Sequence, residues 1–110
     1  MNSRSKGSIA EERGCEYLRS RGVRIIDRNV YNRYGEIDII ALYDGVLHFV
    51  EVKSALAYEQ AINNITPAKL SKLTRAIHSY LQQKKLDLPY CIDALVVSDE
   101  GIEWVENITF

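Results

Sequence analysis

The sequence predicts an α/β domain with a mixed central sheet flanked by helices, in the order αβββαββ. Apolar residues recur with helical spacing near residues 8–21 and 67–85, and a turn signal between two apolar runs predicts a β-hairpin over residues 35–53. A later apolar run at residues 93–98 predicts a buried strand. Helices and strands that alternate in one short chain favour a layered α/β arrangement. The 110 residues are enough for a single domain with a substantial core, residues 1–110.

The composition is that of a soluble globular protein, with 46% hydrophobic and 26% charged residues. No apolar run approaches the roughly 18 residues that a membrane span needs, and no apolar segment follows the first residues as in a secretory signal. Cys15 and Cys91 fall in a predicted helix and a predicted strand, without C-x-x-C spacing, so we expect free buried thiols. Together these features predict a cytoplasmic protein that does not bind membranes.

Charge alternates along the chain, although the net charge is only −1. The net charges are +4, −4, +5 and −6 for residues 1–35, 36–68, 69–85 and 86–110. A protein that acts on phosphodiesters needs basic surface to attract the anion and carboxylates to hold a metal. The alternative is that the charged runs are solvated helix faces, which any one of them also fits.

The first helix and strand come before residue 32. The helix is expected from about Ser8 to Arg21, with Gly22 placed to end it. Its apolar face contains Ala10, Gly14, Tyr17 and Leu18. Residues 23–31 are rich in β-branched side chains and read as a strand, although Asp27 and Arg28 interrupt the pattern.

The hairpin is expected to turn at Asp44-Gly45, which fixes the pairing of its two strands. Counting outward places Asp38 opposite Glu51 and Glu36 opposite Lys53. One face would contain Ile40, Leu42, Leu47 and Phe49, and the other Ile37, Ile39, Val50 and Val52. A hairpin that is apolar on both faces should be covered on both sides, and we expect helices there.

The second helix should begin at Thr66-Pro67, after a connector over residues 54–65 whose structure the sequence leaves open apart from some helical character. Its first turns carry the basic residues Lys69, Lys72 and Arg75, at the end where the helix dipole does not favour cations. These side chains therefore either face solvent or contact phosphate. Strands over residues 93–98 and 102–105 complete the order.

Directly opposed carboxylates repel each other, so Asp38 and Glu51 would gain from a shared Mg²⁺, Mn²⁺ or proton. The Val52 carbonyl lies within reach of such an ion, and an acid from the first helix, Glu11 or Glu12, could complete its ligands. Lys53 shares a strand face with Glu51 and could hold a water or stabilise phosphoryl charge. The simpler alternatives are a Glu36–Lys53 ion pair, a packed His48 and a core Trp104.

The segments Gly35-Glu36-Ile37-Asp38 and Val50-Glu51-Val52-Lys53 resemble the PD-(D/E)xK nuclease signature. More closely, the chain resembles the YraN family of small bacterial proteins, uncharacterised protein family 0102, which is distantly similar to Holliday-junction resolvases. The resemblance covers nearly the whole chain and extends to Lys6-Gly7, Glu11, Tyr17-Leu18, Gly22, Arg28-Asn29, Ile65-Thr66, Lys69 and Asp93.

The resemblance implies a restriction-endonuclease-like fold and a metal-dependent endonuclease acting on DNA, including branched or damaged structures in repair or recombination. Asp38, Glu51 and Lys53 would be catalytic, with Mg²⁺ or Mn²⁺ held by Asp38, Glu51, Val52 and Glu11 and with Glu36 as an outer carboxylate. The expected nucleic-acid contacts are Arg33, Lys69, Lys72 and Arg75. A homodimer would suit a junction-cutting enzyme, which needs two active sites.

Three departures from the family pattern favour a second hypothesis, a non-catalytic nucleic-acid-binding or scaffolding protein on a nuclease fold. Ser54-Ala55 follow Lys53 where relatives have an Arg, Cys91-Ile92 replace an Arg-Phe pair, and Tyr31 replaces another Arg. The lost arginines affect nucleic-acid affinity more than the metal ligands. An RNA substrate also stays open, because no residue pattern here reports on the 2′-hydroxyl.

Overall fold

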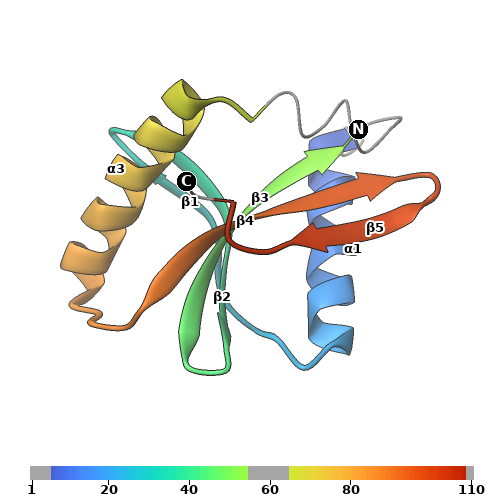
Figure 1. The fold of residues 1–110 in the computed structure, drawn as a ribbon, viewed down its shortest axis with the longest axis horizontal. Coiled ribbons are helices and arrows are strands. Elements are labelled where there is room, and N and C mark those ends of the chain that lie inside the picture. Colours follow the sequence, from blue (N-terminus) through green and yellow to red (C-terminus); the bar gives the residue numbers. More distant parts are fainter. Residues whose placement is uncertain (1–5, 55–64, 109–110) are drawn as a thin grey trace, which may run out of the picture.

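The protein, in a computed structural model that describes residues 6–54 and 65–108, forms a five-stranded sheet with a helix against each face (Figure 1). The elements are α1 (Lys6–Ser20), β1 (Arg24–Asn32), β2 (Gly35–Tyr43), β3 (Val46–Ser54), α3 (Pro67–Lys84), β4 (Tyr90–Ser98) and β5 (Gly101–Val105). The strands lie in chain order, and only β3 and β4 pair in parallel. The mixed sheet is therefore confirmed, and the described elements are compatible with the predicted order αβββαββ.

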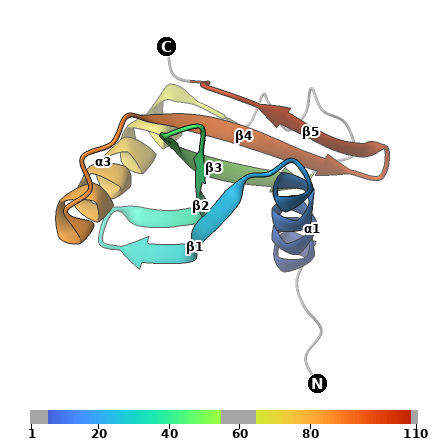
Figure 2. The same cartoon turned by 90° about the horizontal axis from the view of Figure 1, so that it is seen from below.

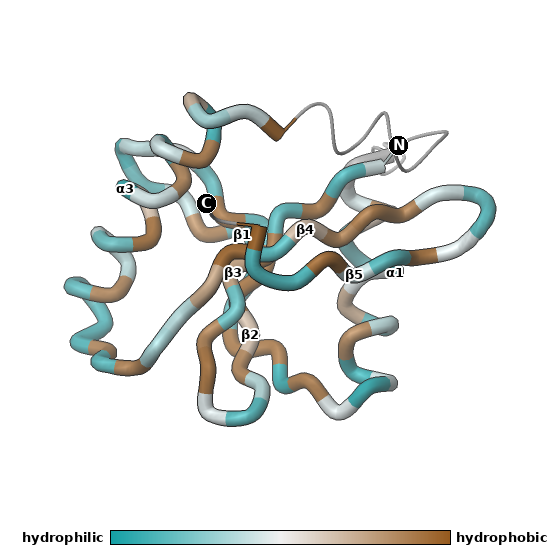
Figure 3. The backbone as a smooth tube through the Cα atoms, viewed as in Figure 1, coloured by the Kyte–Doolittle hydropathy of each residue, from teal (hydrophilic) through white to brown (hydrophobic). Residues whose placement is uncertain are grey.

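Each helix covers its own core, on opposite faces of the sheet (Figure 2). The core under α3 consists of Ile37, Ile40, Leu47, Phe49, Leu73, Ala76, Ile77, Tyr80 and Ile92. The core under α1 consists of Cys15, Leu18, Val23, Ile39, Ala41, Val50 and Leu95. The hydropathy colouring of Figure 3 shows apolar residues concentrated in the strands and polar residues spaced along both helices. Coverage on both faces explains why the hairpin is apolar on both sides.

The hairpin turns at the predicted residues. Asp44 and Gly45 both have positive φ, 53° and 76°, as a two-residue type I′ turn requires. Pairing then runs from Tyr43–Val46 to Ile39–Val50, in the predicted register. The prediction for this part of the hairpin is confirmed.

Beyond Ile39–Val50 the hairpin departs from a regular ladder. The Asp38 carboxylate accepts a hydrogen bond from the Val52 N–H at 2.9 Å, so a side chain takes a bond that a backbone carbonyl would otherwise accept. On the other side of β2, Asn29 has a φ of 51° and lies between two regular pairs of the β1–β2 ladder. Ile37 consequently packs under α3, and its predicted place on the same face as Ile39 is wrong.

Helix α3 begins as predicted. The Thr66 Oγ1 accepts a hydrogen bond from the Lys69 N–H at 3.2 Å, and Pro67 occupies the first turn. The helix connects β3 to the parallel strand β4, and the prediction for the connector before it lies mostly on residues 55–64, outside the described residues. Within residues 6–54 and 65–108, neither helix is long and apolar enough to cross a membrane.

Two elements begin more than one residue before the predicted start. Helix α1 begins at Lys6 instead of Ser8, and β4 begins at Tyr90 instead of Asp93. In β4 the parallel partner sets the start, because Leu47 of β3 pairs with Tyr90. Such a partner cannot be seen in the local sequence of β4.

Candidate functional site

Asp38 is the most perturbed acid of the hairpin. Asp38 is only 8% exposed. Its burial, as the larger cause, and the negative charge of Glu51 raise its pKa from 3.8 to about 7. The Val52 N–H opposes this shift by donating to the carboxylate, whereas the charges of Glu11 and Glu36 add to it. Asp38 and Glu51 therefore act on each other as the sequence predicts, with two further acids close enough to contribute.

Helix α1 contributes Glu11 to this group. Burial, followed by the charge of Glu36, raises the pKa of Glu11, and Glu51 raises it further. Glu12 instead forms an ion pair with Arg28 of β1, with 2.9 Å between its Oε2 and the Arg28 Nη1. Of the two helix acids left open by the sequence, Glu11 is thus the one that belongs to the carboxylate cluster, defined here as Glu11, Glu36, Asp38 and Glu51.

Lys53 lies beside the cluster on the strand face predicted for it. Its Nζ is 3.4 Å from the Glu51 Oε1, and about a quarter of each side chain is exposed. Among the described residues, Lys53 thus forms its ion pair with Glu51. The alternative that it pairs with Glu36 is not what the structure shows. Lys53 therefore partly offsets the negative charge of the cluster.

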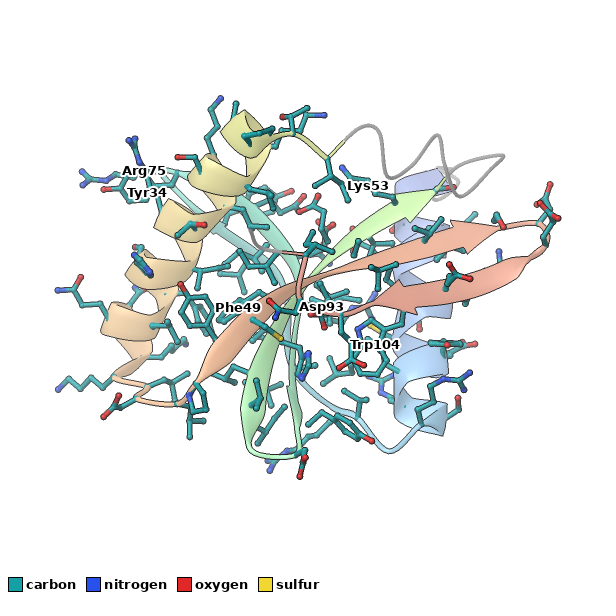
Figure 4. The ribbon with its side chains drawn as sticks, in the orientation of Figure 1. Tyr34, Phe49, Lys53, Arg75, Asp93 and Trp104 are labelled. Atoms are coloured by element: carbon teal, nitrogen blue, oxygen red, sulfur yellow. The ribbon has the colours of Figure 1, made fainter. Side chains whose placement is uncertain are left out.

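A pocket of about 190 Å³ opens next to the cluster, between the end of the β2–β3 hairpin and α3. Lys69 and Lys72 of α3 line it together with Glu36, Glu51 and Lys53. Figure 4 shows Lys53 near the end of β3, on the side where the first turns of α3 lie. The structure therefore brings two of the four predicted nucleic-acid contacts to the acidic site.

The other two predicted contacts lie elsewhere. Arg33 and Arg75 line a separate hollow of about 370 Å³ with His78, Ser79 and Gln82. Of the residues that the structure describes, only Tyr34 lines both cavities. Arg75 and Tyr34 appear side by side at the flank of α3 in Figure 4. The Arg33 guanidinium donates to the Tyr34 hydroxyl at 2.6 Å and lies 4.8 Å from the ring centre. These two arginines are thus on a neighbouring surface.

The carboxylate cluster suits a hard divalent cation. Its side-chain donors are all oxygens, which Mg²⁺ and Mn²⁺ prefer. Four acids near one lysine leave negative charge in excess, and the raised pKa values of Asp38 and Glu11 reflect this together with burial. The Val52 N–H bond places the backbone of Val52 next to Asp38. The ligand roles of Asp38, Glu51, Val52 and Glu11 stay predictions.

The sequence analysis missed a second group of chemically active side chains. His48, Cys91 and Asp93 meet with their donor atoms within 4.8 Å of one another. The His48 Nδ1 lies 2.6 Å from the Asp93 Oδ2, and the Cys91 Sγ lies 3.2 Å from that same nitrogen. A buried aspartate inside an apolar strand is the signal that could have indicated this group, because such a carboxylate needs partners.

The geometry of this second group is that of a hydrogen-bond network. Two ligands held about 2.0–2.1 Å from a tetrahedral zinc ion would be roughly 3.3 Å apart, farther than the 2.6 Å between His48 and Asp93. Asp93 also accepts hydrogen bonds from the Trp104 Nε1 and the Asn107 N–H, each at 2.8 Å. Figure 4 shows Asp93 and Trp104 at the centre of the fold. These groups therefore all form hydrogen bonds with one buried carboxylate, that of Asp93.

Comparison with known proteins gives one consistent result. The profile of uncharacterised protein family UPF0102 matches residues 10–97. The chain is 53% identical to a UPF0102 protein of Helicobacter hepaticus over 109 residues, which is 99% of this chain and 98% of that protein. It is also 53% identical to a UPF0102 protein of Wolinella succinogenes (97% and 98% covered) and 51% identical to one of Sulfurimonas denitrificans (97% and 98% covered).

Proposed function

The chain belongs to the uncharacterised protein family UPF0102, and from its carboxylate cluster we propose that it is an endonuclease that hydrolyses phosphodiester bonds in DNA with Mg²⁺ or Mn²⁺. A restriction-endonuclease-like core is part of this proposal. The observation that carries it is the cluster of four carboxylates beside Lys53, of which Glu36 and Glu51 line a pocket together with Lys69 and Lys72. A structural role alone would not call for so much like charge in one place.

Each residue has a distinct part in the proposed reaction. Asp38 and Glu51 would hold the ion, with the Val52 carbonyl and Glu11 as further ligands and Glu36 as the outer carboxylate. When bound, the ion would lower the pKa of a water and stabilise charge on the phosphoryl oxygens. Lys53 orients the attacking water or stabilises the same developing charge, because its ammonium already lies at the cluster.

The basic residues of α3 have a positioning part. Lys69 and Lys72 line the pocket from the side opposite the hairpin acids, so a phosphate drawn to them comes close to the cluster. Their positive charge offsets the repulsion that the acidic cluster would otherwise exert on an anionic substrate. Arg33 and Arg75 would contact the same nucleic acid farther along, on the neighbouring hollow.

The test is cleavage of labelled four-way junction, flap, single-stranded and duplex DNA, and of matched RNA, with Mg²⁺ or Mn²⁺. We expect cleavage of at least one DNA, and its loss both with a chelator and in Glu51→Ala. Cleavage that survives in Glu51→Ala would overturn the proposed site. Cleavage restricted to RNA would overturn the choice of DNA but not the site.

The second candidate is a nucleic-acid-binding protein without cleavage, and one observation favours it. Tyr31, at the position where the family resemblance implies an arginine, is 75% exposed and pairs with Glu36 across the β1–β2 ladder. At this point the rim of the cluster presents an aromatic ring in place of a cation. Salt-sensitive binding of a DNA that is never cut, in any divalent metal, would select this candidate.

A further inference from the structure

The pocket beside the carboxylate cluster is more apolar than phosphate binding needs. Besides the charged side chains already named, it is lined by Tyr34, Gly35, Ile65, Leu70, Leu73, Ala76 and Ile108. Three of these come from one face of α3, and Leu73 and Ala76 also belong to the core beneath the helix. The pocket thus has an apolar wall that is part of the packed core, and it opens directly onto a charged site.

The size and lining of the pocket select one part of a nucleic acid. Phosphates and sugars are polar, so the heterocyclic face of a base is the part that an apolar wall would hold. A buried apolar cavity of about 150 Å³ in another protein is known to take up benzene. At about 190 Å³ this pocket has room for one base.

We propose that the pocket receives a single unpaired nucleobase next to the phosphodiester bond that is cut, so that the substrates are nucleic acids with unpaired nucleotides, such as single strands, flaps and duplexes with a mismatched or unpaired base. This proposal rests on the proposed function, because it assigns the cutting to the neighbouring cluster. A base that is stacked and paired within a duplex could enter only after being extruded, which costs free energy that an unpaired base does not pay.

The charges around the pocket agree with this occupant. Lys69 and Lys72 line its helix side and Lys53 its hairpin side, so the phosphates that flank an inserted base would meet ammonium groups. Tyr34 is held in its orientation by Arg33, which donates to its hydroxyl at 2.6 Å. Because this ring is already held in place at the pocket wall, contact with a base would cost it little further side-chain entropy.

The first experiment needs no protein variant. One abasic site is moved stepwise along a labelled single strand, which removes one base at a time and keeps every phosphate. Binding is measured by fluorescence anisotropy with a chelator present, and cleavage is measured separately with Mn²⁺. We expect one position at which the abasic site weakens binding and slows cleavage by about five- to hundredfold, the range typical of losing one stacked base.

A matched pair of variants locates the effect. Leu70→Trp would fill the pocket, whereas Leu81→Trp places the same side chain on the same helix, against the same core, away from the pocket. Thermal melts confirm that both variants are folded. We expect Leu70→Trp to bind the intact strand as weakly as wild type binds the critical abasic strand, with no remaining position dependence, and Leu81→Trp to behave as wild type.

The outcomes separate this proposal from the proposed function. Cleavage without any critical position would leave the nuclease standing and overturn the base pocket. A critical position in binding, lost in Leu70→Trp, with no strand ever cut, would support the pocket and overturn the nuclease. Duplex bound and cut as well as single strands would overturn the substrate class, and absence of binding to every nucleic acid would overturn both proposals.

Discussion

The Asp38 carboxylate accepts a hydrogen bond from the Val52 N–H at 2.9 Å, across the end of the regular β2–β3 ladder. This bond ties a proposed metal ligand to the strand that carries Glu51 and Lys53. The site is therefore braced by the backbone of the hairpin itself, and changes to its charges should alter electrostatics more than folding.

Glu51→Ala should leave the metal-free protein at least as stable as wild type. The substitution removes a charge that repels Asp38, and the ion pair lost with Lys53 is part-exposed and worth only about 0–1 kcal/mol. The gain in stability that saturating Mn²⁺ gives wild type, about 2.7 kcal/mol at a hundred times the Kd, should disappear. Urea unfolding with and without the metal measures both effects, and Glu103→Ala, at an exposed residue of β5, is the control. A metal-free mutant clearly weaker than wild type would mean that Glu51 is structural.

The stability of the metal-free protein should fall as pH rises from about 4 to 7. Asp38 keeps its proton in the folded state up to a pKa of about 7 but loses it at 3.8 when unfolded, so in that window the folded state binds more protons. The penalty is absent below 3.8, complete above about 7, and on the order of a few kcal/mol.

Asp38→Asn removes this titration while keeping an oxygen that can accept from Val52. The stability of the mutant relative to wild type should therefore grow through the same pH window and be largest above pH 7. Chemical unfolding at a series of pH values, with a chelator present, measures it, and Asp99→Asn in the exposed β4–β5 turn is the control. Parallel pH profiles for wild type and Asp38→Asn would refute the prediction.

Lys72→Ala should weaken binding of every DNA to a similar degree and reduce its salt dependence. A lysine that meets one phosphate contributes about 0.7–0.9 to the slope of log K against log salt concentration. Lys84→Ala, in the last turn of the same helix and near the Tyr80 ring, should leave the slope unchanged. Titrations at four or more salt concentrations decide between them. Equal slopes for the two variants would mean that Lys72 does not contact phosphate.

Asp93→Ala should destabilise the fold by about 3–5 kcal/mol, the usual cost of breaking a buried charged network. Asp93 is fully buried, and the substitution leaves His48, Trp104 and the Asn107 N–H without their acceptor. Urea unfolding beside Asp99→Ala measures the loss. Because the network contains no member of the carboxylate cluster, Asp93→Ala should still cut DNA at temperatures where it is folded. A fully folded mutant without activity would show that the network takes part in the chemistry.

Local signals account for the parts of the fold and site that were predicted. Asp44-Gly45 forces a tight turn, and the turn sets the register that brings Asp38 and Glu51 together. Thr66-Pro67 starts α3 for equally local reasons. In both cases the deciding atoms lie within a few residues of each other in the sequence.

What could not be predicted depends on distant parts of the chain. His48 meets Cys91 and Asp93 only because β3 and β4 pair in parallel, which no local pattern reveals. Lys72 and Arg75 line different cavities because the placement of α3 on the sheet divides its basic face between them. Ile37 changes face because the ladder loses its regularity around Asp38, which simple alternation along a strand cannot anticipate.

The crossover through α3 also has a consequence for the order of folding. The hairpin joins neighbouring residues, so loop closure costs it little and it can form within microseconds. Strand β4 pairs with β3 only after the whole crossover is in place, which is a slower, non-local step. During synthesis the acidic half of the site should therefore exist before its basic and apolar wall, and the nascent chain should acquire affinity for nucleic acid only once β4 has left the ribosome.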